Sequence, residues 1–339
     1  MNIKSNPYKK YALIHEMFDT VRIIREFKTS AIGQIFTVIK GDSKLILTGE
    51  GSSRIFPANN MRHHQMALGN GPQIFLESST QLLTYPLEEY IVIGASNSGK
   101  TKEIIELFDY LVSCNHPNLY AVTCYRDTPL QRLAKQTIIL EHCNEIAVAA
   151  TKSVVAEALV YESILMSLKK YNFRNDELAD KFQNILNSRI NKAITKALLN
   201  AATVYFVGNN NGVAEELTLK TNEILRKKSA YLPGTYLLHG IEEVINSNDV
   251  LVIVDPLESE FEKIIDIYQK KIGATIIALE SFNCPFLTCT LPRHNFFEDG
   301  YLKLSAGWNL LAETGIMMGI DIDKPERARK IGNEFYLAH

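Results

Sequence analysis

Short, uninterrupted runs of apolar residues alternate with helix-like segments along this chain, and the alternation occurs twice. Runs of this kind suit parallel strands that are covered on both faces. Strand–helix alternation predicts doubly wound α/β domains. The expected strands are Lys44–Thr48, Tyr90–Ile93, Leu119–Thr123, Thr137–Leu140, Thr203–Val207, Val250–Val254, Thr275–Ala278 and Thr288–Leu291.

The two halves have similar segments where their first strands end. Residues Leu45–Ser53 and Val204–Gly212 are both an apolar strand followed by a glycine-containing turn before a helix. We therefore predict a tandem repeat of one α/β domain. Hydroxyl side chains follow the first two expected strands of the first half and are missing from the matching turns of the second. One anion site per chain, in the first half, is expected.

Bulk properties narrow the class of protein. The length of 339 residues allows about two domains, and a net charge of −2 gives no electrostatic reason to expect nucleic acid or an anionic membrane as a partner. Apolar runs are too short for a membrane span, and the first residues lack a signal-peptide pattern. We expect a cytoplasmic protein without cofactor.

Metal binding is also not expected. The five cysteines are scattered without metal-ligand spacing. His63 and His64 are adjacent, so on a helix they face different directions and we predict a surface pair.

The apolar spacing of Ile14, Met17 and Val21 predicts an amphipathic helix in the N-terminal segment.

The hydroxyl-rich segment Ser96–Thr101 is the strongest candidate binding site. It reads Ser96, Asn97, Ser98, Gly99, Lys100, Thr101 and lies between an expected strand and the expected helix 102–111. A helix N-terminus offers unpaired N–H groups and partial positive charge, which suits phosphate. Ser52 and Ser53 follow another strand, at the sheet edge where open α/β sheets bind ligands. Helix capping alone needs one such residue per helix, so the cluster favours a phosphate site.

A competing motif occupies the same segment. Gly94–Thr101 matches Gly-x-x-x-x-Gly-Lys-Thr, the P-loop pattern, and it follows a strand. Val250–Asp255 could then supply the strand and aspartate that hold magnesium. An ATP- or GTP-binding protein is therefore the alternative, although it leaves Ser52 and Ser53 unexplained.

Several segments together resemble the SIS (sugar isomerase) domain family, and within it the isomerase half of glucosamine-6-phosphate synthases. The likeness runs from about Lys44 to Lys330, and its motifs keep the family's order and spacing. It rests on Gly51–Ser53, Ser96–Thr101, Glu145–Lys152, Leu219–Ile224, His239-Gly240 and Asp321–Pro325 through Lys330. It implies two tandem SIS domains, with a helical segment at 1–34, domains at 35–170 and 190–320, and an active-site tail at 321–339.

The resemblance also implies roles for single residues. Glu223 would carry a proton between C1 and C2 of an open-chain sugar, which suits a carboxylate, and Lys220, three residues earlier on the same helix face, would support it. His239 would open the sugar ring from the partner subunit, so a homodimer is expected. Lys330 would form a Schiff base with the C2 carbonyl. Substrate contacts are expected from Ser52, Ser53, Ser96, Asn97, Ser98, Thr101 and Val148.

The sequence departs from the family at three positions, and we do not expect it to contain the glutaminase domain of the synthases. Lys100 replaces an acidic residue, Ile241 a proline and Thr235 a glutamate. The resemblance implies that such a glutaminase domain needs a cysteine as its first mature residue, whereas Asn2 follows Met1 here. Ammonia release from glutamine is therefore not expected.

The expected substrate is a hexose 6-phosphate or amino-hexose 6-phosphate, and two reactions remain open. A deaminase would give fructose 6-phosphate and ammonia. A deglycase would split a fructosamine 6-phosphate into glucose 6-phosphate and an amino acid. A non-catalytic sugar-phosphate sensor is a further alternative, although it would have no need of Lys220, Glu223, His239 and Lys330 together.

Overall fold

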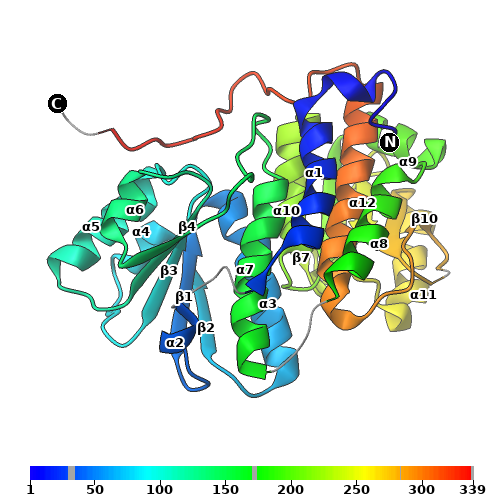
Figure 1. The fold of residues 1–339 in the computed structure, drawn as a ribbon. Coiled ribbons are helices and arrows are strands. Elements are labelled where there is room, and N and C mark those ends of the chain that lie inside the picture. The colour runs from blue at the N-terminus through cyan, green and yellow to red at the C-terminus, as the bar shows by residue number, and fades with distance from the viewer. Residues whose placement is uncertain (30–34, 170–173, 283, 337–339) are drawn as a thin grey trace. The chain divides into compact units, whose positions relative to one another are not determined.

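The structure, a computed structural model, describes residues 1–29, 35–169, 174–282 and 284–336. It divides into two units, each of which we describe by itself (Figure 1). Unit 1 contains Met1–Val21, Ala147–Ala149 and Asp176–Ala328, and unit 2 contains Arg22–Ile146, Ala150–Asn175 and Arg329–His339. Parts of the predicted segments 1–34 and 321–339 fall at residues 30–34 and 337–339, outside the described residues. The bounds predicted for the four segments, 1–34, 35–170, 190–320 and 321–339, stay predictions.

Unit 2 is built on a five-stranded parallel sheet. Its strand order is β2-β1-β3-β4-β5. Every residue of β3 and β4 is buried, as expected of apolar runs covered on both faces. The strands are β1 (Lys44–Gly49), β2 (Gln73–Glu77), β3 (Ile91–Ala95), β4 (Leu119–Thr123) and β5 (Gln136–Ile139).

Helices cover both faces of this sheet. Helices α3 and α7 pack against each other on one face, and α4, α5 and α6 lie on the other (Figure 1). The bounds are α2 (Ile35–Val38), α3 (Ile55–Leu68), α4 (Ser79–Leu82), α5 (Lys102–Ser113), α6 (Pro129–Leu133) and α7 (Lys152–Lys169). Helix α1 (Ala12–Glu26) begins in unit 1 and ends in unit 2.

Unit 1 repeats the arrangement. Its parallel sheet has the order β10-β9-β8-β6-β7, which is the order of the first sheet with each strand replaced by its counterpart five strands later. The strands are β6 (Thr203–Gly208), β7 (Lys228–Pro233), β8 (Val250–Ile253), β9 (Thr275–Glu280) and β10 (Leu287–Thr290).

Helices again lie on both faces. Helix α10 packs on β6, β7 and α12, and α9 packs on α12. Ile264 of α11 and Tyr268 of the π-helical segment that follows it join the apolar core on the other face. The bounds are α8 (Asn175–Asn187), α9 (Lys192–Asn200), α10 (Val213–Lys220), α11 (Phe261–Ile264) and α12 (Phe296–Met317). In the described residues, no helix is both long enough and apolar enough to cross a membrane.

The predicted α/β class with two doubly wound parallel sheets is confirmed. Both sheets also contain one strand that the sequence did not predict, β2 and β7. These are the edge strands next to β1 and β6, and they are only partly buried. An edge strand exposes polar residues on one side, so its sequence lacks the continuous apolar run that marked the other strands.

Candidate functional site

The segment Ser96–Thr101 lies in unit 2, between the end of β3 and the start of α5, as predicted. Gly99 has φ +62°, and a Cβ atom there would lie 2.4 Å from Oγ1 of Thr128. Only glycine fits both the left-handed backbone and this close approach. The turn is therefore sterically fixed around Gly99.

The hydroxyl groups of this loop bond to one another and to the loop backbone. Oγ of buried Ser96 lies 2.9 Å from Oγ1 of Thr101 and accepts the N–H of Gly99 at 3.1 Å, while Oγ of Ser98 accepts the N–H of Lys100 at 3.1 Å. The carbonyl of Asn97 accepts the N–H of Cys124 at 3.0 Å. Ser96 and Asn97 thus shape the loop, and the half-buried Ser98 and Thr101 are its more accessible hydroxyls.

Ser52 and Ser53 lie in the short 3₁₀ turn Gly51–Ser53 that follows β1. Oγ of Ser53 donates to Oε1 of Glu157, a fully buried carboxylate of α7, at 3.2 Å. Because β1 and β3 are neighbours in a parallel sheet, this turn and the Ser96 loop follow adjacent strands at the same sheet edge. Sequence reasoning did not select Glu157, since a glutamate within a helix carries no distinctive pattern.

The C-terminal tail pairs with the Ser96 loop through main-chain atoms. The N–H of Lys102 donates to the carbonyl of Asn333 at 3.0 Å, the N–H of Phe335 donates to the carbonyl of Lys100 at 2.9 Å, and Thr101 forms an antiparallel bridge with Glu334. Nζ of Lys100 lies 3.6 Å from Oε1 of Glu334. Lys100, the residue that completes the P-loop pattern, is therefore half exposed and engaged by the tail.

Lys330 lies on the same tail, beside an enclosed carboxylate. Its Nζ is 3.0 Å from Oε2 of Glu145. Glu145 also accepts the N–H of Thr151 at 2.6 Å and the hydroxyl of Ser153 at 2.9 Å. Burial alone would raise the pKa of Glu145, but the charge of Lys330 and these hydrogen bonds outweigh it and hold the pKa below its usual value. The sequence indicated Glu145 only as part of the motif Glu145–Lys152 and not as a site residue.

Val148 belongs to the three-residue stretch that clusters with unit 1. Its N–H donates to the carbonyl of Asp323 at 2.9 Å. The carboxylate of Asp323 accepts the N–H groups of Ala12 and Leu13, at 2.9 and 2.8 Å, at the start of α1. Asp323 therefore anchors the beginning of the tail by capping a helix.

Lys220 and Glu223 are brought together in unit 1. Nζ of Lys220 lies 2.6 Å from Oε2 of Glu223 and 3.2 Å from Oε1 of Glu216, and the Lys220 side chain is fully enclosed. Burial lowers the pKa of Lys220, but the two carboxylates outweigh it and raise the pKa above its ordinary value. Lys220 is thus a fixed ammonium that holds Glu223 by a charge-assisted hydrogen bond.

Glu223 lies where the helix geometry changes. Helix α10 ends at Lys220 and continues as a π-helical turn, Thr221–Leu225, which ends at Arg226 in a left-handed conformation with φ +55°. Short π-helical turns often occur at functional sites. The turn leaves the Glu223 side chain 20% exposed beside the enclosed Lys220.

Glu223 lines a cavity of about 640 Å³, which we call the Glu223 cavity. Its other walls are Leu219, Asn222, the residues from Arg226 to Lys228 and the tail segment Pro325–Ala328. Nη2 of Arg226 donates to the carbonyls of Asp321 and Lys324 at 2.7 and 3.0 Å. Arg226 thereby fastens the tail beside the π-helical turn.

His239 follows a 3₁₀ turn, Tyr236–Leu238, in unit 1. It is exposed, and its Nε2 lies 3.4 Å from Oγ1 of Thr235. An exposed histidine is what the predicted role in a partner subunit's site requires. That role stays a prediction.

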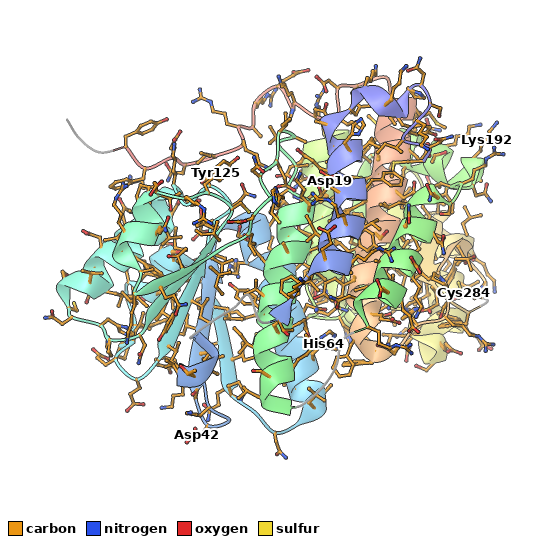
Figure 2. All side chains as sticks on the ribbon, viewed as in Figure 1. Asp19, Asp42, His64, Tyr125, Lys192 and Cys284 are labelled. Atoms are coloured by element: carbon orange, nitrogen blue, oxygen red, sulfur yellow. The ribbon has the colours of Figure 1, made fainter. Side chains whose placement is uncertain are left out.

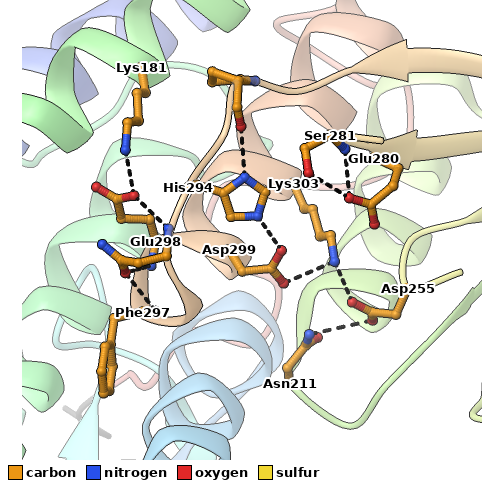
Figure 3. A network of polar contacts seen from close by, with 12 residues as sticks. Lys181, Asn211, Asp255, Glu280, Ser281, His294, Phe297, Glu298, Asp299 and Lys303 are labelled. Carbon is orange, nitrogen blue, oxygen red and sulfur yellow. Dashed lines mark hydrogen bonds and ion pairs between the residues drawn. The ribbon is translucent and has the colours of Figure 1, made fainter. Parts of the chain in front are cut away.

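At the matching edge of the second sheet, the protein's own carboxylate takes the place of hydroxyl groups. Asp255, just after β8, accepts the N–H of Asn209, just after β6, at 2.8 Å. It also accepts a hydrogen bond from Nζ of Lys303 at 2.7 Å (Figure 3). Lys303 also contacts Asp299, which is bonded to His294 at 2.7 Å. This edge of the sheet is filled by an internal ion-pair network.

The prediction that His64 lies on the surface is wrong. His64, on α3 (Figure 2), is 1% exposed, and its Nδ1 lies 2.6 Å from Oε1 of Glu162 on α7. Burial of His64 is possible because its partner Glu162 lies on a helix that packs against α3 but is far away in the sequence. No local sequence pattern indicates this pairing. Within the described ranges, no group of three or more His, Cys, Asp and Glu side chains is placed to hold a metal ion.

The predicted site residues therefore form two groups, each within one unit. Unit 2 holds Ser52, Ser53, the Ser96 loop and Lys330, and unit 1 holds Val148, Lys220, Glu223 and His239. The first group has the features of an anion site. The second contains a carboxylate fixed by an ammonium at the wall of a cavity, which suits proton transfer.

Comparison with known proteins identifies the class. Residues 39–167 match the SIS domain family. Residues 39–167 therefore carry a SIS domain, and the resemblance to this family seen in the sequence is confirmed. The match covers the first sheet and the Ser96 loop, which favours the sugar-phosphate over the P-loop interpretation of Gly94–Thr101.

Particular relatives are glutamine–fructose-6-phosphate aminotransferases and sugar-phosphate enzymes. The isomerizing aminotransferase of Neisseria meningitidis serogroup B is 23% identical over 266 residues, 71% of this chain and 43% of its own length. The chain thus spans less than half the length of that curated relative.

Solved structures share the fold of the chain. The C-terminal domain of the aminotransferase of Francisella tularensis has a TM-score of 0.72 and 15% identity, covering 95% of this chain and 100% of that one. Glucosamine-6-phosphate deaminase of Thermotoga maritima has a TM-score of 0.74 and 17% identity, covering 94% and 98%.

Proposed function

We propose that this protein catalyses 1,2-proton transfer on an amino-sugar 6-phosphate, as a deaminase or a deglycase. The observation that carries the proposal is the pair Lys220–Glu223, a buried ammonium bonded at 2.6 Å to a partly exposed carboxylate. A sugar-phosphate binding protein that only senses its ligand has no use for a fixed base at a cavity wall.

The proposed roles follow the chemistry of each group. Ser98, Thr101 and the N-terminus of α5 bind the 6-phosphate, with Ser52 and Ser53 at the neighbouring strand end. Glu223 removes a proton from one of the carbons C1 and C2 and returns it to the other. Lys220 orients Glu223. His239 assists ring opening from the partner subunit of a homodimer.

Either reaction balances with water alone. In a deaminase, proton transfer from C2 to C1 of glucosamine 6-phosphate gives an imine at C2, which water converts to fructose 6-phosphate and ammonia. In a deglycase, transfer from C1 to C2 of a fructosamine 6-phosphate gives an imine at C1, which water converts to glucose 6-phosphate and the free amine.

Lys330 is proposed as the group that forms a Schiff base with the C2 carbonyl of the open-chain ketose phosphate. Water leaves as the C2=N bond forms, and water adds again when that bond is broken. Amine attack needs a neutral lysine that is free of its partner. Lys330 must therefore leave Glu145 before it can react, and the tail that carries it is the part that has to move.

The test is incubation with glucosamine 6-phosphate and, separately, with fructoselysine 6-phosphate, with assays for ammonia and for free lysine. Release of either product supports the proposal and selects the reaction. Tight binding of both compounds without turnover would instead make the protein a sugar-phosphate sensor.

A further inference from the structure

Basic side chains gather at the Glu223 cavity. Arg226, Lys227, Lys228 and Arg327 line it, against the two carboxylates of Glu223 and Glu326. Glu223 is already paired with Lys220. The cavity wall therefore has an excess of positive charge beside the carboxylate proposed to transfer the proton.

Two of these four cations are held by the protein itself. Arg226 bonds to the tail carbonyls and lies 3.8 Å from Oε1 of Glu326. Nζ of Lys227 donates to the carbonyl of Ala201 at 2.7 Å, and burial lowers the pKa of Lys227. These two side chains shape the wall.

The other two cations are available to a ligand. Lys228, at the start of β7, and Arg327, on the tail, are exposed. In the described part of the chain, neither side chain makes a hydrogen bond or an ion pair with another residue, although the main chain of Lys228 pairs with β6. An anion in the cavity could therefore be met by one ammonium and one guanidinium, which bind carboxylates by charge-assisted hydrogen bonds.

The position of Glu223 identifies which part of a substrate would contact Lys228 and Arg327. This step rests on the proposed function: if Glu223 moves a proton between C1 and C2, the nitrogen bonded to one of these carbons lies at the same cavity. The 6-phosphate is four carbons away from C2. The group that extends from the nitrogen is thus the part of the substrate closest to this wall.

We propose that the substrate is a hexose 6-phosphate whose amino nitrogen carries a carboxylate, which is an amino-acid conjugate, and that Lys228 and Arg327 bind this carboxylate. The reaction is then the deglycase. Glu223 takes a proton from C1 and returns it to C2, water adds to the C1 imine, the C1–N bond breaks, and the amino acid leaves with the proton on its nitrogen. There is no net oxidation or reduction.

The test uses fructosamine 6-phosphates that differ only in the group on nitrogen. The methylamine conjugate has no carboxylate, the glycine conjugate has one, and the aspartate conjugate has two. We expect kcat/KM for the glycine conjugate to exceed that for the methylamine conjugate by about 10-fold or more, since a charge-assisted hydrogen bond discriminates by roughly this factor. The difference should lie in KM.

Variants then assign the effect to the cavity. In Lys228→Gln and Arg327→Gln, the ratio of kcat/KM between the glycine and methylamine conjugates should fall by about 5- to 10-fold each. In Arg327→Glu it should fall further. The matched control is Lys192→Gln, an exposed lysine at the start of α9, which should leave the ratio unchanged.

Two results would overturn the inference while leaving the proposed function intact. One is turnover of glucosamine 6-phosphate or of the methylamine conjugate with no preference for a carboxylate. The other is an equal loss with every substrate in the Lys228 and Arg327 variants, which would show that these cations do not recognise the carboxylate. If wild-type protein turns over no member of the series, the proposed function itself fails, and this inference with it.

Discussion

Nζ of Lys330 lies 3.0 Å from Oε2 of Glu145, a carboxylate with no exposed side-chain surface. The pair joins the tail to the segment that precedes α7, and both residues belong to unit 2. Because removal of one partner leaves a buried charge with fewer compensating groups, this contact has measurable consequences for stability.

We expect Lys330→Met to make the protein more sensitive to acid. The pKa of Glu145 is lower in the folded chain than in the unfolded chain, so its contribution to stability is present above about pH 4.3 and is lost as the pH falls through the folded value. Without Lys330 the folded pKa of Glu145 rises, so the loss begins at a higher pH. Urea unfolding between pH 3 and 7 measures this.

At neutral pH, the same variant should lose roughly 1–3 kcal/mol of unfolding free energy. Lys324→Met, at an exposed position of the same tail, is the control. Identical acid profiles for wild type and Lys330→Met would show that the contact contributes nothing in solution.

The accessible hydroxyls of the Ser96 loop should bind the phosphate. We expect Ser98→Ala and Thr101→Ala each to weaken hexose 6-phosphate binding by about 1–3 kcal/mol, the value of a lost hydrogen bond to a charged group. Isothermal titration calorimetry measures the change. Ser113→Ala, at the opposite end of α5, should bind normally, and unchanged affinity in both loop variants would remove the phosphate from this loop.

Glu223→Gln separates proton transfer from binding. Glutamine keeps the shape of the side chain but cannot accept and return a proton at neutral pH. We expect kcat to fall by about 10²–10⁴-fold with little change in sugar-phosphate affinity. Glu215→Gln, earlier on α10, serves as the control, and full turnover by Glu223→Gln would exclude Glu223 as the base.

His294 should make the stability of unit 1 depend on pH near neutrality. The hydrogen bond to Asp299 raises the pKa of His294, against the opposing effect of burial (Figure 3). The contribution of His294 to stability is therefore complete below its pKa in the unfolded chain, about 6.5. This contribution is lost as the pH rises through the pKa of His294 in the folded chain. The difference in unfolding free energy between wild type and His294→Asn should shrink from pH 6 to pH 9. A difference that does not vary with pH would refute this role.

The sequence predicted the parts of the fold that local patterns encode. Continuous apolar runs such as Leu119–Thr123 mark buried strands, and the glycine-containing turns mark the strand ends where ligands bind. The edge strands β2 and β7 were not predicted because they are only partly buried and lack a continuous apolar run.

The candidate site shows the same limit. Ser96–Thr101 and the pair Lys220–Glu223 are contiguous motifs, and the sequence alone indicated them. Glu145, Glu157 and Asp255 act through partners that are 46 to 185 positions away in the chain. Their roles depend on packing, and the π-helical turn at Thr221–Leu225 depends on it as well.

The pairing of Asn333–Phe335 with the Ser96 loop uses main-chain atoms. A segment held in this way tolerates exchange of its side chains far better than a change in its length. One inserted residue between Lys330 and Asn333 would displace the lysine along the tail by about 3.3 Å. This displacement is as large as the 3.0 Å distance between Nζ of Lys330 and Oε2 of Glu145. The number of residues between Lys330 and Asn333 therefore sets the position of the lysine. The side chains between them can be exchanged as long as that number is kept.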